Sequence, residues 1–514
     1  MGANATAQVT AGAVNLSWRE KLAAFARSRE TALLFGAILP LALVLRLISL
    51  GSKSFDEDEI VSALLARGDL PEFWSRVSHS ETNMVLYFAV LRFWNHLGQS
   101  EFALRSFSVI IALAAVLALY SLGTRAFGRQ VGTLGALLLA INGFHIQHSQ
   151  YARSYSLLMF LVTLSSLFFL QGLRDGSRKN WKRYIVASTL AIYAHLFAVF
   201  VLVAHWVFFL LLARKWAPWR RLVPSTAAIA FLALPMELFV VLSKMGYLHI
   251  YWVPRTTMRS VYDLLGCFAG RPPQVFLPPH GQVLLLCAYS IPMVLAVLAL
   301  ARSCPWSIDR TETWYLTFFA TWLAVPILLT LAISMRKPVF VDKYLIICLP
   351  PFVLLGSYGF SRFRRGWPVI ALLCVIAGLT ARGLLTYYKS PGQDWRGIAQ
   401  YILSNQQPGD AAAFFPDYYS EKLEYYLQKE AAKLPGSVSS NLALLGHSAD
   451  TSFGPLLQSL PSRYDRVWFI GRADWTKAAD LQKHSITATL AAEFPGPQKE
   501  KRFPGGLVVI LYSK

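Results

Sequence analysis

Eleven apolar segments constrain the fold of this 514-residue chain more than any other feature. A lipid bilayer core is about 30 Å thick, and a helix needs roughly 20 apolar residues to cross it. The composition, 55% hydrophobic and only 15% charged, excludes an ordinary soluble enzyme, a disordered chain and a fibrous repeat. We therefore expect a polytopic α-helical membrane protein with about eleven transmembrane helices, at 31–50, 103–123, 131–147, 154–172, 184–196, 197–213, 222–243, 281–301, 313–334, 344–361 and 368–387.

Lys and Arg are distributed unequally between alternate loops, and this bias predicts the orientation of the chain. Cytoplasmic loops carry an excess of both residues. With the N-terminus inside, the inner segments hold 20 basic residues in 73 positions and the outer loops hold 12 in 104. The net charge of +21 then reflects basic cytoplasmic loops, and we expect no nucleic-acid partner. We expect residues 1–30 in the cytoplasm, the C-terminus outside, and a bacterial inner or plasma membrane as the location.

Three segments outside the spans are large enough to build structure of their own. The first outer loop, 51–102, contains an apolar stretch at 84–97 that is too short to cross and predicts a helix lying in the membrane interface. The large outer loop 244–280 is rich in aromatic and basic residues. Hydropathy falls after the last span. We predict one transmembrane domain over 31–387 and a small extracytoplasmic α/β domain over 388–514.

Four consecutive acidic residues, Asp56, Glu57, Asp58 and Glu59, follow the first span. Acidic residues favour the first turn of a helix, so a solvated helix start explains them in the simplest way. Clustered carboxylates between a membrane span and an interfacial helix also raise each other's pKa. A carboxylate in that position can serve as a general base or as a metal ligand. Both interpretations stay open from the residues alone.

Cations stand in two other outer loops. Arg153 lies in the second, and Arg336, Lys337 and Lys343 lie in the fifth. Interfacial anchoring accounts for such residues, because long basic side chains reach the headgroups. An anion site is the functional alternative, because a guanidinium offers a planar fork to phosphate oxygens.

Histidines and aromatic residues add weaker signals. His145 and His148 lie three residues apart, which places both on one helical face, but two histidines alone indicate a metal weakly. His195, between two spans, is better explained as an ordinary hydrogen-bonded histidine. Tyr251 and Trp252 in the large outer loop suit a sugar or lipid headgroup, and equally a loop lying on the membrane.

Short motifs in order along the chain carry a family resemblance. They are Ser54-Phe55, Asp58-Glu59, Ser62 and Ala66-Arg67-Gly68; Asn83 to Tyr87, Gly98, Ser100-Glu101 and Arg105; Ser149, Gln150, Ala152, Arg153 and Tyr155; His195-Leu196-Phe197; Lys343-Tyr344-Leu345 and Pro350; and Asp394-Trp395-Arg396. Over about 50–400 the arrangement resembles the GT-C glycosyltransferases, specifically the protein O-mannosyltransferase-like group (glycosyltransferase family 39), with the lipid A aminoarabinose transferases as relatives.

This sequence departs from the family pattern at three places. Met84-Val85 stand where the family has two prolines. Tyr151 replaces an acidic residue that many relatives carry, which puts a divalent metal in doubt. Lys343 replaces an arginine and keeps the charge without the bidentate geometry.

The resemblance implies transfer of a sugar from a polyprenyl-phosphate donor to an acceptor hydroxyl on the outer face. The acceptor could be a protein, a glycolipid or a glycan. Asp58 is the expected general base, with Asp56 as second choice, in a single displacement that inverts the anomeric centre. A double displacement would instead use Glu59 or Asp56 as nucleophile. Arg153 and Lys343, with Arg336 and Lys337 nearby in sequence, would bind the donor phosphate.

The expected substrate-side residues and metal candidates complete this set. The substrate-side residues are Tyr87, Tyr155, His195, Tyr251 and Trp252. A divalent metal is not required by the residues, and its candidate ligands are Asp58, His145 and His148.

A transporter or flippase of lipid-linked sugars is the competing class, since it would share the many spans and the basic phosphate contacts. Transporters often have repeated halves and charges near the bilayer midplane. The sequence has no convincing internal repeat and its acidic cluster lies in an outer loop, which favours the enzyme. A non-catalytic scaffold is a third class, against which the loop motifs argue.

Overall fold

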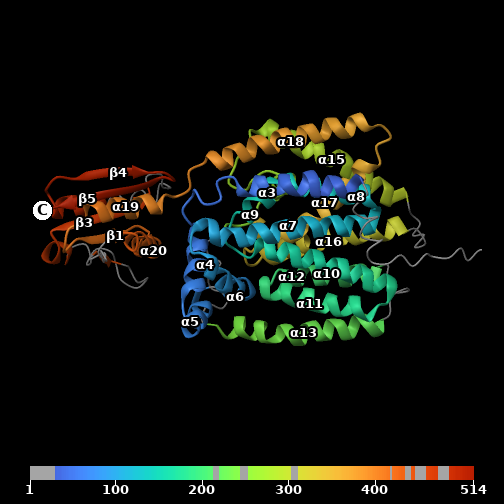
Figure 1. Cartoon of the computed structure of the whole chain (residues 1–514), viewed down its shortest axis with the longest axis horizontal. Helices are drawn as coiled ribbons and strands as arrows, with labels where there is room; N and C mark the ends of the chain where they lie inside the picture. Colours follow the sequence, from blue (N-terminus) through green and yellow to red (C-terminus); the bar gives the residue numbers. More distant parts are fainter. Residues whose placement is uncertain are drawn as a thin grey trace, which may run out of the picture.

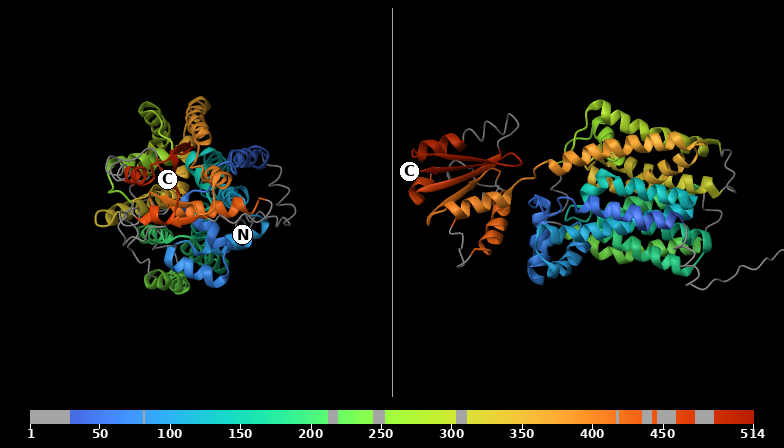
Figure 2. Two further views of the ribbon diagram at one scale, coloured as in Figure 1. Left: turned by 90° about the vertical axis from the view of Figure 1, so that its left-hand side faces the viewer. Right: turned by 45° about the horizontal axis from the view of Figure 1, so that its top comes forward.

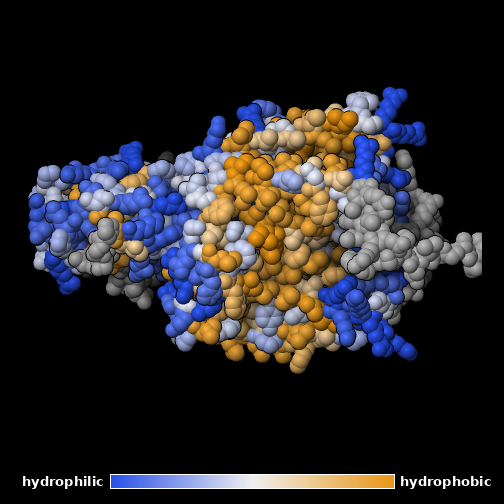
Figure 3. All heavy atoms as spheres, viewed as in Figure 1, coloured by the Kyte–Doolittle hydropathy of each residue, from blue (hydrophilic) through white to orange (hydrophobic). Residues whose placement is uncertain are grey.

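The protein consists of a bundle of long helices and a smaller sheet domain, which lie end to end (Figures 1 and 2). Hydrophobic side chains form a band over the visible side of the bundle, whereas hydrophilic residues cover the sheet domain (Figure 3). This is the predicted fold class. The computed structural model describes residues 29–80, 82–211, 219–243, 253–302, 311–416, 419–434, 442–445, 459–472 and 486–514.

Within the described residues, eight helical segments are long and apolar enough to cross a membrane, and each coincides with a predicted span. The first is a composite of α2, the π-helical η1 and α3, and the seventh combines the 3-10 helix η5 with α17. The segments are α2 (Arg29–Leu33), η1 (Leu34–Ile38) and α3 (Leu39–Leu47), α7 (Glu101–Phe127), α10 (Tyr155–Asp175), α13 (Trp219–Leu242), α15 (Pro279–Arg302), α16 (Thr311–Ser334), η5 (Asp342–Cys348) and α17 (Leu349–Ser361), and α18 (Gly366–Lys389).

The other three predicted spans correspond to shorter helices, α8 (Arg129–Ile141), α11 (Arg178–Ala194) and α12 (Ala198–Leu211). The stretch 184–213 is interrupted after Ala194, where we expected it to be. The continuous span expected at 131–147 is wrong, because α8 ends at Ile141 and a separate helix, α9 (Gly143–Ser149), follows.

The break between α8 and α9 has a local cause and a tertiary cause. The Asn142 side chain caps α9 by accepting a hydrogen bond from the backbone N–H of His145 at 3.0 Å. Its Nδ2 donates to the carbonyl of Phe268 at 2.9 Å, on the short helix α14 (Met258–Phe268). Gly143 permits the close approach of this loop, because a Cβ at this position would lie 2.4 Å from the carbonyl oxygen of Gly270, to which the N–H of Gly143 donates at 3.1 Å.

Helices of the first outer loop cover part of the end of the bundle that faces the sheet domain (Figure 1). They are α4 (Glu57–Arg67), α5 (Leu70–Ser80), α6 (Val85–Trp94) and the short η2 (Asn95–Leu97). Helix α6 coincides with the stretch predicted to lie in the membrane interface. The ring of Trp74 on α5 packs edge-on against Phe239 of α13, with centroids 6.0 Å apart.

The sheet domain has the α/β character expected from its sequence. Its five strands lie in the order β2-β1-β3-β5-β4; β1 is parallel to β2 and β3, whereas β5 is antiparallel to β3 and β4. Its elements are α19 (Trp395–Asn405), β1 (Ala411–Phe414), α20 (Tyr419–Ala431), β2 (Ala443–Leu445), β3 (Arg466–Arg472), β4 (Lys499–Phe503) and β5 (Leu507–Ser513).

Ion pairs fasten the sheet domain to the bundle. Glu101, at the start of α7, lies 2.9 Å from both Arg396 of α19 and Lys429 of α20. The buried Lys422 of α20 pairs with Glu57 of α4 at 3.2 Å. The sheet domain therefore contacts the first turn of the helix that carries the acidic cluster.

Candidate functional site

The acidic cluster forms the first turn of α4, as the helix-start interpretation predicts. Asp56 is the N-cap residue, and its Oδ1 accepts a hydrogen bond from the N–H of Glu57 at 2.8 Å. The carboxylate of Glu59 reaches back to the N–H of Asp56 at 3.1 Å, which completes a capping box. This local chemistry fixes the start of the helix and leaves Asp58 outside the cap.

Glu59 is buried and fully engaged. Its two oxygens accept hydrogen bonds from Arg105 of α7 at 2.8 and 2.7 Å, and Oε1 also accepts one from the N–H of Ala152 at 2.8 Å. Arg105 donates further bonds to carbonyls of the first loop. This buried bidentate pair joins α4, α7 and the second outer loop.

Asp58 meets two cations that come from two other loops. Lys343 Nζ donates to Asp58 Oδ2 at 2.8 Å, and Arg153 Nε lies 4.0 Å from the same oxygen. Arg153 Nη1 also donates to the backbone carbonyl of Asp58 at 3.1 Å. The side chain of Arg153 is only 3% exposed, against 20% for Lys343 and 30% for Asp58. Residues at 58, 153 and 343 thus form one cluster, which we call the Asp58 cluster.

The charges around Asp58 decide its protonation. Burial favours the neutral acid, but the positive charges of Arg153 and Lys343 and the hydrogen bond from Lys343 outweigh it and lower the pKa of Asp58 to about 2. Asp58 is therefore ionised at neutral pH. The cluster that it forms with Arg153 and Lys343 has a net positive charge.

Aromatic residues surround the Asp58 cluster. Lys343 Nζ lies 5.7 Å from the ring centroid of Tyr155. The His195 ring is 4.9 Å from Tyr344 and 6.4 Å from Tyr155, and its Nε2 lies 3.2 Å from Nδ2 of Asn83. Of the predicted substrate-side residues, Tyr155 and His195 lie beside the cluster.

The other predicted site residues have different surroundings. Tyr87 is buried, and its hydroxyl shares a hydrogen bond with Ser108 at 2.9 Å. Arg336 is exposed and Lys337 is half-buried in the turn after α16. Tyr251 and Trp252 fall outside the described residues.

The two histidines proposed as metal ligands lie on α9 and are buried. His145 Nδ1 accepts a hydrogen bond from the buried Arg46 at 2.8 Å, and the ring of His148 packs on Phe144 and Tyr155 at 4.8 and 5.1 Å. In the part of the chain that the structure describes, no three His, Cys, Asp or Glu side chains are grouped closely enough to hold a metal ion.

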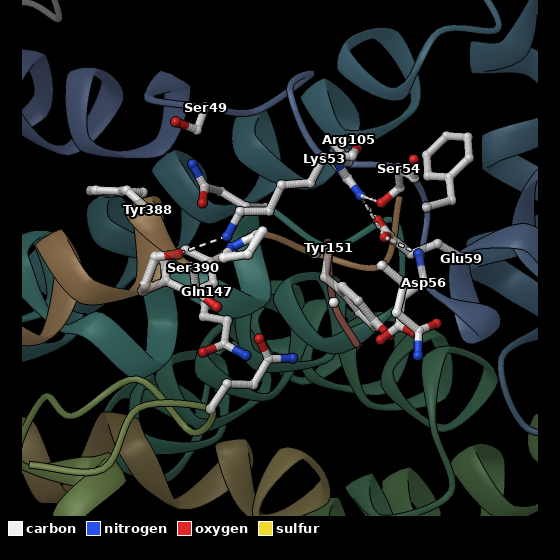
Figure 4. Close-up of a pocket in the computed structure, with 18 of the residues that line it drawn as sticks. Ser49, Lys53, Ser54, Asp56, Glu59, Arg105, Gln147, Tyr151, Tyr388 and Ser390 are labelled. Atoms are coloured by element: carbon white, nitrogen blue, oxygen red, sulfur yellow. Dashed lines mark hydrogen bonds and ion pairs between the residues drawn. The ribbon is translucent and has the colours of Figure 1, made fainter. Parts of the chain in front are cut away.

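A cavity of about 300 Å³ opens beside Asp56 (Figure 4). It is lined by the first outer loop and the residues just before it, by Arg105 of α7, by α9 and the residues after it, by Gln274 of the loop after α14, by the end of α18 and the segment that follows it, and by two residues of the sheet domain. Tyr151 lies at its edge and donates to Asp56 Oδ2 at 2.8 Å. Sequence reasoning missed this cavity, because its residues come from distant parts of the chain.

Comparisons with known proteins bear on the fold of the chain. Over residues 81–240 the chain matches the family described as dolichyl-phosphate-mannose-protein mannosyltransferase. Its structure is similar to that of apo ArnT from Cupriavidus metallidurans, with a TM-score of 0.60 and 14% identity over 93% of this chain and 97% of that one. The chain has the GT-C fold.

Two further structures of the GT-C fold were solved with lipid phosphates. ArnT bound to undecaprenyl phosphate matches with a TM-score of 0.58 and 13% identity, over 93% of this chain and 98% of that one. AglB from Archaeoglobus fulgidus, in complex with an inhibitory peptide and a dolichol-phosphate, matches with a TM-score of 0.52 and 10% identity, over 90% of this chain and 71% of that one. No curated protein matches the chain significantly.

Proposed function

We propose that this chain is a membrane glycosyltransferase that moves a sugar from a polyprenyl-phosphate-linked donor to a hydroxyl group of an acceptor. The observation that carries the proposal is the Asp58 cluster, a carboxylate and two cations at one end of an apolar bundle. The family match over 81–240 and the GT-C structures that hold lipid phosphates support the same assignment.

The two cations suit a phosphate in different ways. Arg153 is nearly buried and offers a planar fork to two phosphate oxygens, whereas Lys343 is a point charge on a flexible stem. As the bond between the anomeric carbon and the phosphate oxygen breaks, the oxygen keeps the electron pair and gains charge. Fixed cations stabilise such charge by several kcal/mol in a water-poor site.

Asp58 is the proposed base. The acceptor oxygen forms a bond to the anomeric carbon, its proton passes to Asp58, and the polyprenyl phosphate leaves from the opposite side, so the anomeric centre inverts. With pKa about 2, Asp58 is a weak base in the free protein. A bound phosphate shares the charges of Arg153 and Lys343, which raises the pKa of Asp58 and strengthens it as a base.

Asp56 remains the second choice as base. Glu59 is a weaker candidate for a nucleophile, because both of its oxygens are engaged by Arg105. Arg153 and Lys343 supply the positive charge at the phosphate, and a divalent metal stays a prediction that a chelator tests.

The test is consumption of radiolabelled polyprenyl-phosphate sugars by the full chain in lipid nanodiscs. Asp58→Asn should lower turnover by about 10²–10⁴-fold while donor still binds, because the proton acceptor is lost and Arg153 and Lys343 still hold the phosphate. Lys343→Ala should weaken donor binding. Glu72→Gln, in an exposed ion pair with Arg76, is the matched carboxylate control and should act like the native protein.

The outcomes separate the alternatives. If Asp56→Asn abolishes transfer and Asp58→Asn does not, the roles of the two carboxylates are exchanged. Loss of activity with chelator, restored by a divalent cation, would establish a metal. In sealed proteoliposomes, donor that crosses the membrane without being consumed, equally in native protein and Asp58→Asn, would support the transporter and contradict the proposal.

A further inference from the structure

Two short segments separate the Asp58 cluster from the cavity in Figure 4. Asp56 and Tyr151 line the cavity and are joined by a hydrogen bond of 2.8 Å. Two residues further along each segment, Arg153 donates to the carbonyl of Asp58 at 3.1 Å. Asp58 and Arg153 are absent from the cavity lining. The cavity is therefore a second compartment that shares a wall with the Asp58 cluster.

The cavity is lined by carboxamides that can still accept hydrogen bonds. Gln147 is only 6% exposed, and its Oε1 is buried with no hydrogen-bond partner among the described residues. The Nε2 of Gln150 donates to the carbonyls of Arg46 and Ile48 at 2.9 and 2.7 Å, which fixes that side chain. A buried carboxamide oxygen without a donor is unfavourable, and a rotation of the Gln147 side chain toward the cavity would let a ligand hydroxyl group satisfy it.

Three cations line the cavity, Lys53, Arg105 and Arg472, and the first two are held by contacts within the protein. Arg105 forms its bidentate pair with Glu59. Lys53 Nζ donates to the carbonyl of Tyr387 at 2.6 Å and lies 4.3 Å from the centroid of that ring. Burial, with a smaller effect of nearby Arg105, lowers the pKa of Lys53 to about 8. Lys53 and Arg105 are less available to a phosphate than the cations of the Asp58 cluster.

Both parts of the protein form the cavity. The linker from Ser390 to Gln393 and Gly505, in the turn between β4 and β5, belong to its lining. The turn approaches the linker so closely that a Cβ on Gly505 would lie 2.6 Å from Cα of Gln393, and Gly505 has φ +79°. The sheet domain thus forms part of a preformed pocket, whose volume of about 300 Å³ is at the lower end for small-molecule sites.

We propose that this interdomain cavity binds a neutral carbohydrate, through hydrogen bonds from its hydroxyl groups to Gln147, Gln150 and Asp56. If the proposed function holds, on which this part of the inference rests, the carbohydrate is the acceptor, and a glycan or glycolipid sugar is the substrate class. Because the wall separates the cavity from Asp58, the cavity holds a sugar unit of the acceptor next to the unit whose hydroxyl group reacts.

The test measures occupancy of the cavity without any turnover. Gln274, an exposed residue of the lining, is replaced in Gln274→Cys, and maleimide labelling of that thiol is followed by peptide mass spectrometry on the full chain in nanodiscs. The probes are maltotetraose, cellotetraose and chitotetraose, with glucose 6-phosphate, inorganic phosphate and a serine-rich peptide as alternatives. Glu72→Cys, on exposed α5, is the control outside the cavity.

We expect a saturating neutral oligosaccharide to slow labelling of Gln274→Cys about tenfold and to leave Glu72→Cys unchanged. Adding Gln147→Leu should remove the protection, and Gln147→Asn should restore part of it. In the transfer assay, Gln147→Leu should raise the acceptor KM about threefold to tenfold without changing the donor KM.

The result distinguishes this inference from the proposed function. Protection only by phosphate, by the phosphorylated sugar or by the peptide overturns it, as does protection by none of the probes. Sugar transfer without oligosaccharide protection contradicts the cavity assignment alone. Oligosaccharide protection without any sugar transfer leaves the carbohydrate site standing and contradicts the proposed transferase.

Discussion

Four neighbouring acidic residues acquire four different environments at the start of α4. Asp56 caps the helix, Glu57 pairs with a lysine of α20, Asp58 meets cations of two outer loops, and Glu59 pairs with an arginine of α7. The physical reason is rotation, because successive residues of a helix point about 100° apart. Asp58 is the member of the four that reaches the two loop cations, and this is why it carries the proposal.

The lowered pKa of Asp58 predicts how stability depends on pH. A carboxylate whose pKa is depressed to about 2 stabilises the folded state above its unfolded pKa of about 4, and this contribution is lost as pH falls from about 4 to about 2. The free energy of unfolding of the native protein should therefore exceed that of Asp58→Asn by about 2 kcal/mol at pH 7. This difference should disappear in acid. Thermal unfolding in detergent over this range measures it.

Glu72→Gln serves as the control for this pH dependence. Its carboxylate belongs to a surface ion pair with Arg76, which contributes about 0–1 kcal/mol. A stability difference between native protein and Asp58→Asn that stays constant from neutral to acid pH would contradict the assigned charge environment.

At the level of elements, the break between α8 and α9 positions the second outer loop. Asn142 caps α9, and a backbone contact between Gly143 and Gly270 holds the break against the loop after α14. Helix α9 then leads directly to Tyr151 and Arg153, one on the cavity and the other in the Asp58 cluster. An unbroken helix would carry both residues elsewhere.

Gly143→Ala tests this element. An added Cβ would lie 2.4 Å from the carbonyl oxygen of Gly270, which is backbone and cannot move aside as a flexible side chain could. We expect a loss of about 1–3 kcal/mol of stability and a weaker donor interaction, because Arg153 shifts with α9. Thermal unfolding and donor binding measure the two effects.

Gly366→Ala is the matched control, since nothing lies within 4 Å of a Cβ added at that position in α18. It should be neutral or slightly stabilising. Equal destabilisation by the two substitutions would show that the Gly143 contact does not hold the break.

At the level of the whole molecule, the site and the basic loops lie at opposite ends of the bundle. Helix α10 begins at Tyr155 beside the Asp58 cluster and ends at Asp175, so its 21 residues extend about 31 Å. The five-cation segment 173–183 follows at the far end. The bias toward positive residues on the cytoplasmic side predicts that the Asp58 cluster and the sheet domain lie outside.

Two single-cysteine additions test the orientation. Lys179→Cys follows α10, and Gln407→Cys lies in the sheet domain; both positions are exposed. In intact cells a membrane-impermeant maleimide should label Gln407→Cys and should label Lys179→Cys only after permeabilisation. Native protein gives the background from its own cysteines. The opposite labelling pattern would mean that the chain is inserted the other way.

The sequence by itself determined the membrane architecture and the chemical types of the site. Whether a segment can cross a bilayer depends on its own length and polarity, so the eight long helices were predictable locally. The same holds for the interruption after Ala194 and for the α/β character of the last domain. The acidic helix start and the outer cations were also visible, because each motif is contiguous.

Only the tertiary structure decided which of these residues meet. Asp58 and Lys343 are 285 positions apart, and no local pattern states that one donates to the other at 2.8 Å. The break at Asn142 depends partly on a carbonyl 126 residues away. The cavity beside Asp56 combines residues of both domains. The contacts between these residues and the walls of the cavity arise from the packing of distant segments. Hydropathy along the chain carries no information about that packing.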